Sequence, residues 1–287
     1  MFDVCVIGHV TKDVIKVNGE IQREIPGGAA YYTSMALRSL GLDVAVITKV
    51  ASEDHDHVLN ALKRAGIVVY CQESERTTAF ENTYVREDPD VRIQRVTAIA
   101  PPFSPSDMPS ISAAICHVGP LTSADVSLEL LKALSPKANR ISLDVQGLLR
   151  RVINDEVRET DWQDKAEGLG YVDILKANEH EARILSGEDD VEKAVVRLSS
   201  FGPKEIIITC GGRGSIILVD GRLYRIPPVP PRRVVDPTGC GDTYVAGYLY
   251  QRIKSRDISA AGRFGALIAT AKLERFGAFS GRGKELP

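Results

Sequence analysis

The segment 236–250 reads DPTGCGDTYVAGYLY, and its residue types suit the binding and transfer of an anionic group. Gly239, Cys240 and Gly241 open an apolar-periodic run that we expect to be a helix. Small residues leave the backbone N–H groups at a helix start accessible to an anion such as phosphate. Asp242 follows directly and could accept a proton from an attacking hydroxyl. The spacing fits phosphoryl transfer, and it also fits a plain glycine-rich helix cap.

Composition and charge restrict the class of protein. The chain has 287 residues, with 36 Lys and Arg against 38 Asp and Glu, so its formal net charge is −2. This balance argues against nucleic acid as the main partner. The apolar runs are too short for transmembrane helices, and the start MFDVCVIGHV is typical of a buried strand rather than a signal peptide. Five scattered cysteines without CxxC spacing predict neither disulfides nor a zinc site, so we expect a cytoplasmic protein that binds no membrane.

Strand-like and helix-like segments alternate along the chain, which predicts an α/β fold with a mainly parallel central sheet. The expected strands of this sheet are 4–8, 44–48, 114–118, 140–145, 173–177 and 205–209. The helices expected between them are 29–40, 54–65, 124–134, 179–186 and 191–200. A hairpin of strands 215–219 and 222–226 and two helices, about 241–255 and 258–274, are expected to follow.

Two stretches break this rhythm. The first, DVIKVNGEIQREI, has an Asn-Gly turn signal between two alternating runs, and the second, 77–99, has two alternating runs around an Asp-Pro-Asp triplet. Alternation implies one wet face, so we expect about 12–25 and 77–99 to form a small antiparallel sheet, a lid over the main sheet. Because core elements separate the two stretches, we expect a single domain, 1–287, with the lid inserted in it.

Five segments, in order along nearly the whole chain, resemble the motifs of the PfkB, or ribokinase-like, carbohydrate kinases. They are GHVTKDVI at 8–15, PGGAAYYTSMALRSLG at 26–41, KANEHEA at 176–182, TCGGRGS at 209–215 and DPTGCGDTYVAGY at 236–248. The resemblance implies a three-layer α/β/α fold with a β lid. It also implies an ATP-dependent kinase that phosphorylates an alcohol group of a small polyhydroxy substrate, a sugar or a cyclitol.

The resemblance assigns roles around the phosphate. Asp242 would be the general base, and Gly239, Cys240 and Gly241 would form the anion hole for the transferred group. Asn178 would organise Mg²⁺ between the ATP phosphates together with Glu181, through water, as suits a hydrated hard cation. The residues implied to line the ATP site are Thr209, Gly211 and Gly214, those implied to bind the acceptor are Asp13, Gly27 and Gly28, and a monovalent cation, K⁺, is implied near Asp236.

Two positions depart from the family pattern. Tyr32 stands where the family often has an Asn that touches the sugar, which puts a ribose-type pocket in doubt. Gln146 and Arg150 occupy the place of a D-x-N…R pattern that faces phosphate and substrate, with one extra methylene before the amide. GGAAYY, DVQGLLR and the short lid together resemble the myo-inositol kinase branch.

Structural explanations compete with these functional ones. Asp242 could only complement the helix dipole, and Asn178 with Glu181 also forms a capping-box pattern. His55 and His57 suit a solvated helix start better than a metal site, and Cys240 at a helix start invites comparison with a nucleophile although no His adjoins it.

Alternative functions also remain open. Neither a dinucleotide-binding G-x-G-x-x-G after a strand nor a P-loop motif occurs in the sequence. A nucleoside kinase of the same family and a non-catalytic sensor of sugar or nucleotide are the alternatives to a polyol kinase. The lid edges could pair with a second copy to give a homodimer.

Overall fold

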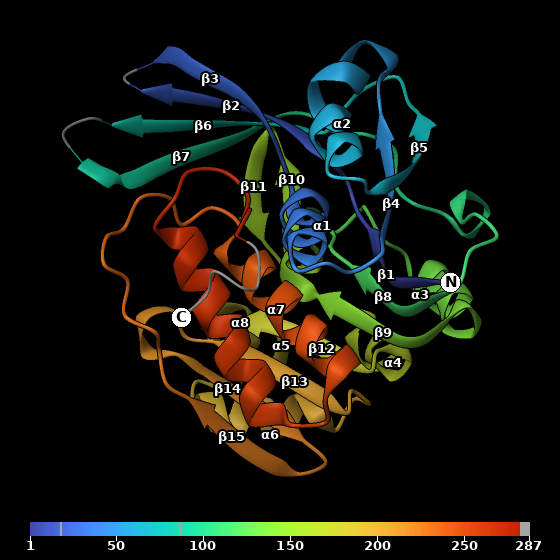
Figure 1. The fold of residues 1–287 in the computed structure, drawn as a ribbon, viewed down its shortest axis with the longest axis vertical. Coiled ribbons are helices and arrows are strands. Elements are labelled where there is room, and N and C mark those ends of the chain that lie inside the picture. Colours follow the sequence, from blue (N-terminus) through green and yellow to red (C-terminus); the bar gives the residue numbers. More distant parts are fainter. Residues whose placement is uncertain (18, 86–87, 282–287) are drawn as a thin grey trace.

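The centre of the fold is a large sheet, in a computed structural model that describes residues 1–17, 19–85 and 88–281 (Figure 1). Its nine strands, in order across the sheet, are β15 (Arg222–Ile226), β14 (Ser215–Val219), β13 (Glu205–Thr209), β12 (Ile174–Asn178), β9 (Ala138–Asp144), β8 (Ala113–Val118), β1 (Phe2–Ile7), β4 (Val44–Val50) and β5 (Val68–Glu73). All neighbours from β13 to β5 are parallel, whereas β14 and β15 form the antiparallel hairpin at one edge. The predicted mainly parallel sheet is confirmed.

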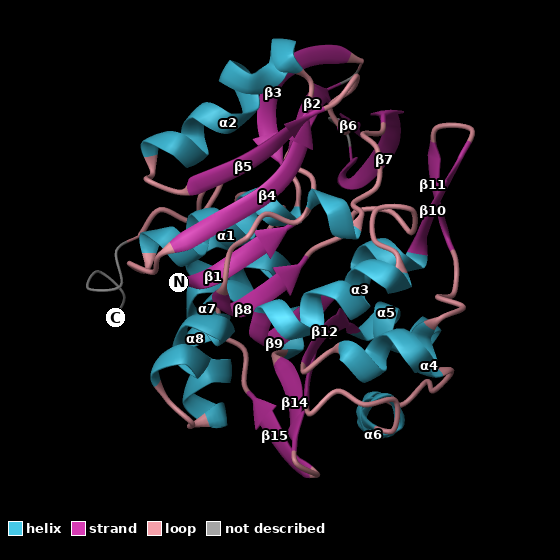
Figure 2. Cartoon of the chain, turned by 90° about the vertical axis from the view of Figure 1, so that its right-hand side faces the viewer, coloured by secondary structure: helices cyan, strands magenta, loops and turns pink. Residues whose placement is uncertain are grey.

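Helices cover both faces of this sheet, which gives three layers (Figure 2). One face carries α1 (Ala29–Ser39), α2 (His55–Arg64), α7 (Cys240–Lys254) and α8 (Ile258–Leu273), and the other carries α3 (Leu128–Leu134), α4 (Lys165–Gly168), α5 (Glu179–Ser186) and α6 (Val191–Ser199). Strand β1 contributes side chains to the hydrophobic cores on both faces of the sheet. Val4 and Val6 pack in the core on the first face, and Cys5 and Ile7 pack in the core on the second. Such two-sided burial explains why these strands read as unbroken apolar runs.

The predicted elements agree with the observed ones closely, with a few differences. Strand β5 and the short α4 were not predicted. Helix α3 begins at Leu128, later than expected, because the Ser127 hydroxyl accepts a hydrogen bond from the Leu130 amide and so caps the helix there. Before it, the buried Asp125 carboxylate accepts the amides of Leu121 and Thr122, which favours a turn.

A second sheet stands off the first as the lid (Figure 1). Its strands in order are β10 (Arg150–Ile153), β11 (Glu156–Glu159), β7 (Asp88–Ala98), β6 (Ala79–Val85), β2 (Thr11–Val17) and β3 (Glu20–Gly27). Neighbours are antiparallel except β2 and β6, which run parallel. The predicted lid lacked the hairpin β10–β11. The Asp-Pro-Asp triplet predicted as a turn begins strand β7, and the connection at 86–87, like Asn18 in the other predicted turn, lies outside the described residues.

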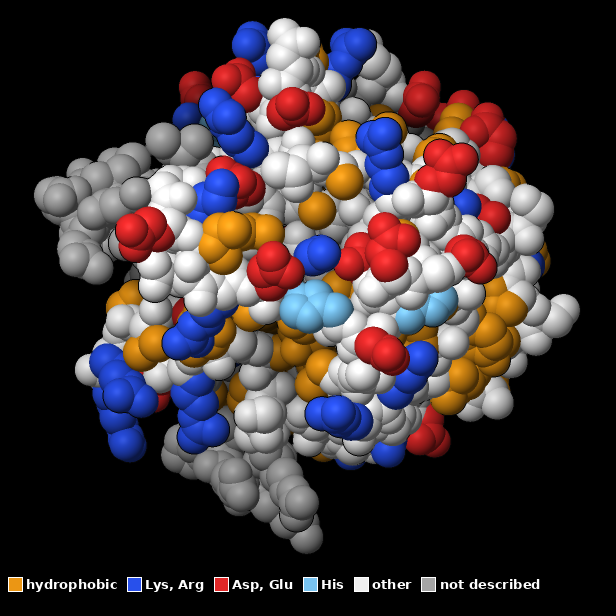
Figure 3. All heavy atoms as spheres, turned by 90° about the horizontal axis from the view of Figure 1, so that it is seen from above, with side chains coloured by type: hydrophobic (Ala, Val, Ile, Leu, Met, Phe, Trp, Pro, Cys, Tyr) orange, Lys and Arg blue, Asp and Glu red, His pale blue; other side chains and the backbone are white. Residues whose placement is uncertain are grey.

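The surface over the lid and α2 carries side chains of both charge signs (Figure 3). Basic and acidic side chains are interspersed there, and hydrophobic ones occur in small groups between them. None of the helices in the described ranges has the length and apolar character to cross a lipid bilayer.

A buried ion network fastens α7 to the large sheet. The Glu205 carboxylate, at the start of β13, accepts hydrogen bonds from Arg252 at 2.7 and 3.0 Å and from the Tyr248 hydroxyl at 2.6 Å, both from α7. Arg140 of β9 adds a contact at 3.4 Å. Burial alone would raise the pKa of Glu205, but the hydrogen bonds from Arg252 and Tyr248 hold it below its ordinary value.

Replacing Glu205 should therefore destabilise the fold without touching the pocket chemistry. Because Glu205→Ala leaves a buried guanidinium and a phenol without their acceptor, we expect the free energy of unfolding to fall by about 3–5 kcal/mol. Chemical denaturation at neutral pH measures this loss. Glu192→Ala, which removes an exposed partner of Arg225, is the matched control and should change stability little. Equal stability of the two variants would contradict a structural role for the network.

Candidate active site

A pocket of ≈ 370 Å³ lies between the carboxyl ends of the parallel strands and the lid. Open α/β sheets bind their ligands at this edge. The predicted site residues that line it are Asp13, Gly28, Tyr32, Gln146, Arg150, Asn178, Thr209, Gly211, Gly239, Gly241 and Asp242. The fold therefore brings together segments that lie more than two hundred residues apart in the chain, from β2 to the start of α7.

A second pocket, of ≈ 560 Å³, adjoins the first. The two share Thr209, Gly211 and Gly241, so they meet at the end of β13 and the start of α7. Predicted site residues Gly214 and Cys240 line this second pocket and not the first. Much of the rest of its wall is apolar, from Pro228, Val229, Pro230, Pro231, Val234, Ala266, Ala269 and Leu273. The arrangement places a polar chamber beside an apolar one, with the predicted phosphate-binding turn between them.

The backbone at the start of α7 is arranged for an anion. Gly239 is the N-cap residue and has a left-handed conformation, with φ of 76°. Within the described ranges, the amides of Gly239 and Gly241 donate to no protein acceptor, whereas the Cys240 amide donates to the Pro237 carbonyl at 3.2 Å. A candidate anion hole at this turn would therefore differ from the predicted one, because the turn itself uses the Cys240 amide and leaves the two glycine amides available.

Tyr32 explains why residue 239 is a glycine. A Cβ atom on Gly239 would lie 2.4 Å from the Tyr32 ring, which is itself 2% exposed. Burial, followed by the nearby carboxylates of Asp13 and Asp236, raises the pKa of the Tyr32 phenol far above its ordinary range. Tyr32 borders the pocket, but its ring packs under the turn at the start of α7, a role that the sequence did not reveal.

Asp242 lies at the floor of the pocket, where it is partly exposed. Desolvation raises the pKa of Asp242 to about 7, with Asp144 and Glu181 adding to the rise and Lys176 and Arg150 opposing it. A carboxyl group with a pKa near neutrality is well suited to act as a general base at physiological pH, because it is both available and basic. The role of Asp242 as general base stays a prediction, and its place in the pocket and its raised pKa are compatible with it.

A buried ion pair missed by sequence reasoning lies directly beneath this site. The Lys176 ammonium contacts the Asp144 carboxylate at 2.8 Å, and both side chains are nearly inaccessible to solvent. A Cβ atom on Gly241 would lie 3.0 Å from the Lys176 ammonium nitrogen, so the lysine lies against the first turn of α7. Burial alone would lower the pKa of Lys176, but Asp144, Glu181 and Asp242 raise it well above its ordinary value. The lysine therefore stays charged beside the predicted base.

Asn178 and Glu181 form a reciprocal capping box at the start of α5. The Asn178 side chain accepts from the Glu181 amide at 2.8 Å, and the Glu181 carboxylate accepts from the Asn178 amide at 2.7 Å. The structural explanation is thus correct for both residues. Oxygen donors also suit Mg²⁺, but the single side-chain oxygen of Asn178 and one carboxylate oxygen of Glu181 already accept backbone amides, so the pair fits a hydrated ion contacted through water. Desolvation raises the pKa of Glu181, and the Lys176 charge opposes this.

The acceptor side of the pocket depends on close backbone packing. Gly28 has φ of 87°, and a Cβ atom there would lie 2.4 Å from the His9 carbonyl oxygen. Gly27, predicted to bind the acceptor, lines neither pocket but packs behind the wall, where a Cβ atom would lie 2.5 Å from the Asp13 carboxylate. The Asp13 carboxylate also accepts the Thr11 hydroxyl at 2.7 Å, which fixes its orientation at the pocket edge. Lid residues Phe80 and Gln94 complete this side, and sequence reasoning did not select either.

The structure supports neither Cys240 as a nucleophile nor a directly ligated metal at His55 and His57. Burial raises the pKa of the Cys240 thiol to about 11, so it is a protonated small side chain at neutral pH rather than a nucleophile. Across the described ranges, no cluster of His, Cys, Asp and Glu side chains suits a directly ligated metal, and this includes His55 and His57.

Removing the buried ammonium should shift the pH dependence of turnover. Lys176→Met takes away a charge that stabilises ionised Asp242, so we expect the pKa of Asp242 to rise and the acid limb of the kcat/KM profile to move up by about 1 pH unit or more. Lys204→Met, at an exposed lysine before β13, is the matched control and should leave the limb in place. A folded Lys176→Met variant with an unmoved limb would contradict this electrostatic coupling.

Comparisons with known proteins agree with this arrangement. A family description, "pfkB family carbohydrate kinase", matches residues 1–282. The chain is 27% identical, over 98% of its length and 99% of the relative's, to a cytidine kinase of Thermococcus kodakarensis. It also superposes on a sulfate complex of a pyrophosphate-dependent kinase in the ribokinase family with a TM-score of 0.87, at 32% identity over 96% of this chain and 97% of the other.

A complex of a pyrophosphate-dependent kinase of the ribokinase family with a pyrophosphate analogue and myo-inositol gives the same TM-score, 0.87, at 30% identity over 96% of this chain and 97% of the other. The match over the whole described fold confirms the ribokinase-like α/β architecture. Kinases of this family are phosphotransferases for which ATP is the usual donor. The chain belongs to the pfkB family of carbohydrate kinases.

Proposed function

We propose that this kinase transfers the γ-phosphoryl group of ATP to a hydroxyl of a small polyhydroxy acceptor, a cyclitol such as myo-inositol. One observation carries the proposal: the polar and the apolar pocket meet at Gly241, beside Asp242. The donor occupies the apolar pocket with its phosphates directed at the start of α7, and the acceptor occupies the polar pocket under the lid.

The residues at the junction supply what phosphoryl transfer needs. Asp242 takes the proton from the acceptor hydroxyl, whose oxygen forms the new bond to phosphorus as the bond to the ADP oxygen breaks. The amides of Gly239 and Gly241 stabilise the charge on the transferred group, and the buried Lys176 ammonium adds a fixed positive charge behind them. A bound Mg²⁺ neutralises charge on the donor phosphates, and Asn178 and Glu181 would hold its water shell.

The identity of the donor is argued from the second pocket. Its proline, valine, leucine and alanine side chains offer no hydrogen-bond donors to an inorganic anion, but they can pack against the face of a nucleotide base. Three of the similar solved structures are described as pyrophosphate-dependent kinases, so pyrophosphate is the alternative donor. Pyrophosphate would use only the glycine amides and the neighbouring cations and would leave the apolar walls without a partner.

The acceptor class is argued from the first pocket. Thr11, Asp13, Gln94, Gln146 and Arg150 present hydroxyl, carboxylate, amide and guanidinium groups to it. Several polar groups around one small chamber suit a molecule with hydroxyls on every carbon, and one similar solved kinase was studied with myo-inositol. A relative described as a cytidine kinase makes a nucleoside acceptor the second candidate, for which Phe80 and Tyr32 are the aromatic neighbours.

Loss of the base should abolish turnover without loss of the fold. We expect Asp242→Asn to reduce phosphorylation of the best acceptor in a polyol and nucleoside panel by about 10²–10⁴-fold. The pKa of Asp242 is raised in the folded state, so ionisation of this carboxyl group costs stability as the pH increases towards 7. At pH 8 the variant should therefore unfold at the same temperature as the wild type or higher.

ADP release with Mg-ATP and thermal unfolding measure the two effects. Undiminished turnover in Asp242→Asn would remove the residue from its proposed role. Binding of polyol and nucleotide by the wild type with no product would favour a sensor instead, and selective turnover of nucleosides would favour the second candidate.

The apolar walls should matter for a nucleotide and not for pyrophosphate. Val234 lines the second pocket and is 69% exposed, so Val234→Ala should leave the fold intact. We expect the KM for ATP to rise by about threefold to tenfold, since roughly two methylene contacts are lost. Val196→Ala, at an exposed valine on α6, is the matched control. If pyrophosphate supports faster turnover than ATP and Val234→Ala changes neither KM, the donor assignment is wrong.

A further inference from the structure

The ammonium group of Lys272 lies behind the phosphate-binding turn, in the last turn of α8. Lys272 is 1% exposed, and its nitrogen donates to both the backbone oxygen and the carboxylate of Asp236, each at 2.8 Å. The same carboxylate accepts the amides of Thr238 at 2.9 Å and Gly277 at 3.3 Å. The oxygens of Asp236 are thus shared between one cation and the two flanking backbone segments.

The family resemblance implies a monovalent cation, K⁺, near Asp236, and the residues present do not fit it. Such an ion is held by carboxylate and carbonyl oxygens, and here both kinds of oxygen on Asp236 already accept hydrogen bonds from an ammonium group. A K⁺ ion at these oxygens would lie beside the lysine charge in a buried place, where like charges repel strongly. The lysine and the ion therefore exclude each other.

The ammonium reaches the anion hole by two routes. Asp236 begins the turn that leads to Gly239, and its carboxylate, fixed by Lys272, holds the Thr238 amide inside that turn. The ammonium also lies 5.9 Å from the centre of the Tyr32 ring, which packs directly against Gly239. In addition, the amides of Val235 and Asp236 donate to the Leu273 carbonyl, next to Lys272 in α8. Helix α8 thereby sets the position of the turn.

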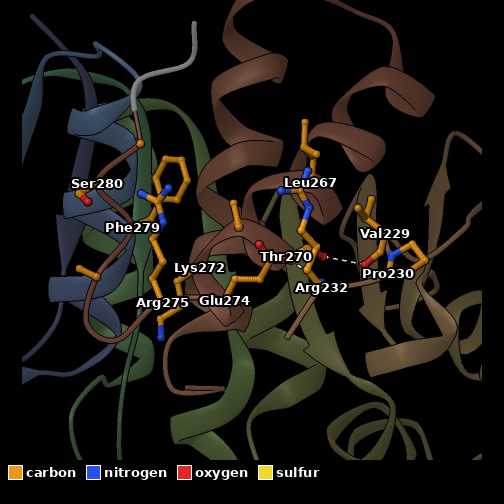
Figure 4. Close-up of a pocket in the computed structure, with 13 residues that line it drawn as sticks. Val229, Pro230, Arg232, Leu267, Thr270, Lys272, Glu274, Arg275, Phe279 and Ser280 are labelled. Atoms are coloured by element: carbon orange, nitrogen blue, oxygen red, sulfur yellow. Dashed lines mark hydrogen bonds between the residues drawn. The ribbon is translucent and has the colours of Figure 1, made fainter. Parts of the chain in front are cut away.

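The end of α8, where Lys272 lies, borders a cavity and makes further hydrogen bonds. A cavity of ≈ 350 Å³ borders the end of α8, lined by Lys272, Glu274, Arg275 and Phe279 and, from the opposite segment, Arg232 (Figure 4). Glu274 accepts the Arg232 amide at 2.5 Å, and the Thr270 hydroxyl donates to the Val229 carbonyl at 2.9 Å. These bonds hold the segment 229–232 against the end of α8, and the lysine side chain is directed to Asp236.

We propose that Lys272 is a tethered monovalent cation that takes the place of K⁺ and makes this kinase independent of it. The ammonium carries the same charge as the ion and donates to the oxygens that the ion would contact. Lys272 is a positioning residue, because it acts on the transferred phosphate only through Asp236, Tyr32 and Gly239. The inference rests on the proposed anion hole, so its tests include readouts that need no turnover.

The wild type gives the first test. With ionic strength held constant by tetramethylammonium chloride, KCl should change neither the unfolding temperature nor the affinity for a non-hydrolysable ATP analogue or imidodiphosphate. It should also leave kcat/KM unchanged with whichever donor is active. A saturable increase with K⁺ in any of these would overturn the proposal, and so would an anomalous peak for Tl⁺ beside the Asp236 carboxylate in a soaked crystal.

Removal of the Lys272 ammonium group gives the second test. Lys272→Ala should lower donor-analogue affinity and kcat/KM by about tenfold or more, and K⁺ or NH₄⁺ should restore part of both losses, whereas tetramethylammonium should not. Lys254→Met, at an exposed lysine near the end of α7, is the control and should show neither loss nor cation response.

Full activity of Lys272→Ala without K⁺, or a folded variant that no cation rescues, would contradict the proposal. If the variant does not fold, the wild-type measurements decide alone. If no acceptor is turned over, the proposed function fails, while the unfolding and analogue-binding arms still report on Lys272.

Discussion

Close packing behind the first turn of α7, the turn proposed to bind phosphate, is the constraint on which the candidate site depends. Tyr32 and Lys176 approach Gly239 and Gly241 so tightly that a side chain at either position would meet them. The Tyr32 ring requires a glycine at 239, whereas the flexible end of Lys176 approaches Gly241 less closely, and the ring and the ammonium together fill the space behind the turn. The parallel sheet, the Glu205 network and helix α8 all hold this short turn in place.

Two lysines from different elements give the turn its electrostatic character. Lys176, from β12, lies beneath Gly241 and balances the carboxylates around Asp242, and Lys272, from α8, anchors Asp236 at the other end of the turn. Both are buried, so each charge is paired with an acidic side chain, as burial requires. The site thus carries its own fixed cations, and the carboxyl group of Asp242 has a pKa near 7 because burial and the neighbouring acids outweigh the opposing charges of Lys176 and Arg150.

Sequence reasoning recovered the parallel sheet, most helices and most of the pocket wall, because those features are encoded locally. Apolar runs, the hairpin of 215–219 with 222–226 and the spacing of Gly239 and Asp242 are each visible within a few residues. What it missed depends on pairing across the chain: the hairpin β10–β11 joins the lid through the pairing of Glu156 with Arg95 and a hydrogen bond from the Val96 amide to the Asp155 carbonyl. Gln94 likewise reaches the pocket only once β7 is in register. No local sequence pattern marks Lys176 or Lys272, because the role of each depends on an acidic residue that lies far away in the chain, Asp144 for Lys176 and Asp236 for Lys272.

The most direct test of the account is a crystal structure with ADP, aluminium fluoride and the preferred acceptor. We expect the aluminium to lie over the amides of Gly239 and Gly241, with the acceptor hydroxyl between it and the Asp242 carboxylate and the adenine against Val234 and Pro230. Aluminium fluoride bound away from the start of α7, or an acceptor hydroxyl out of reach of Asp242, would contradict the account.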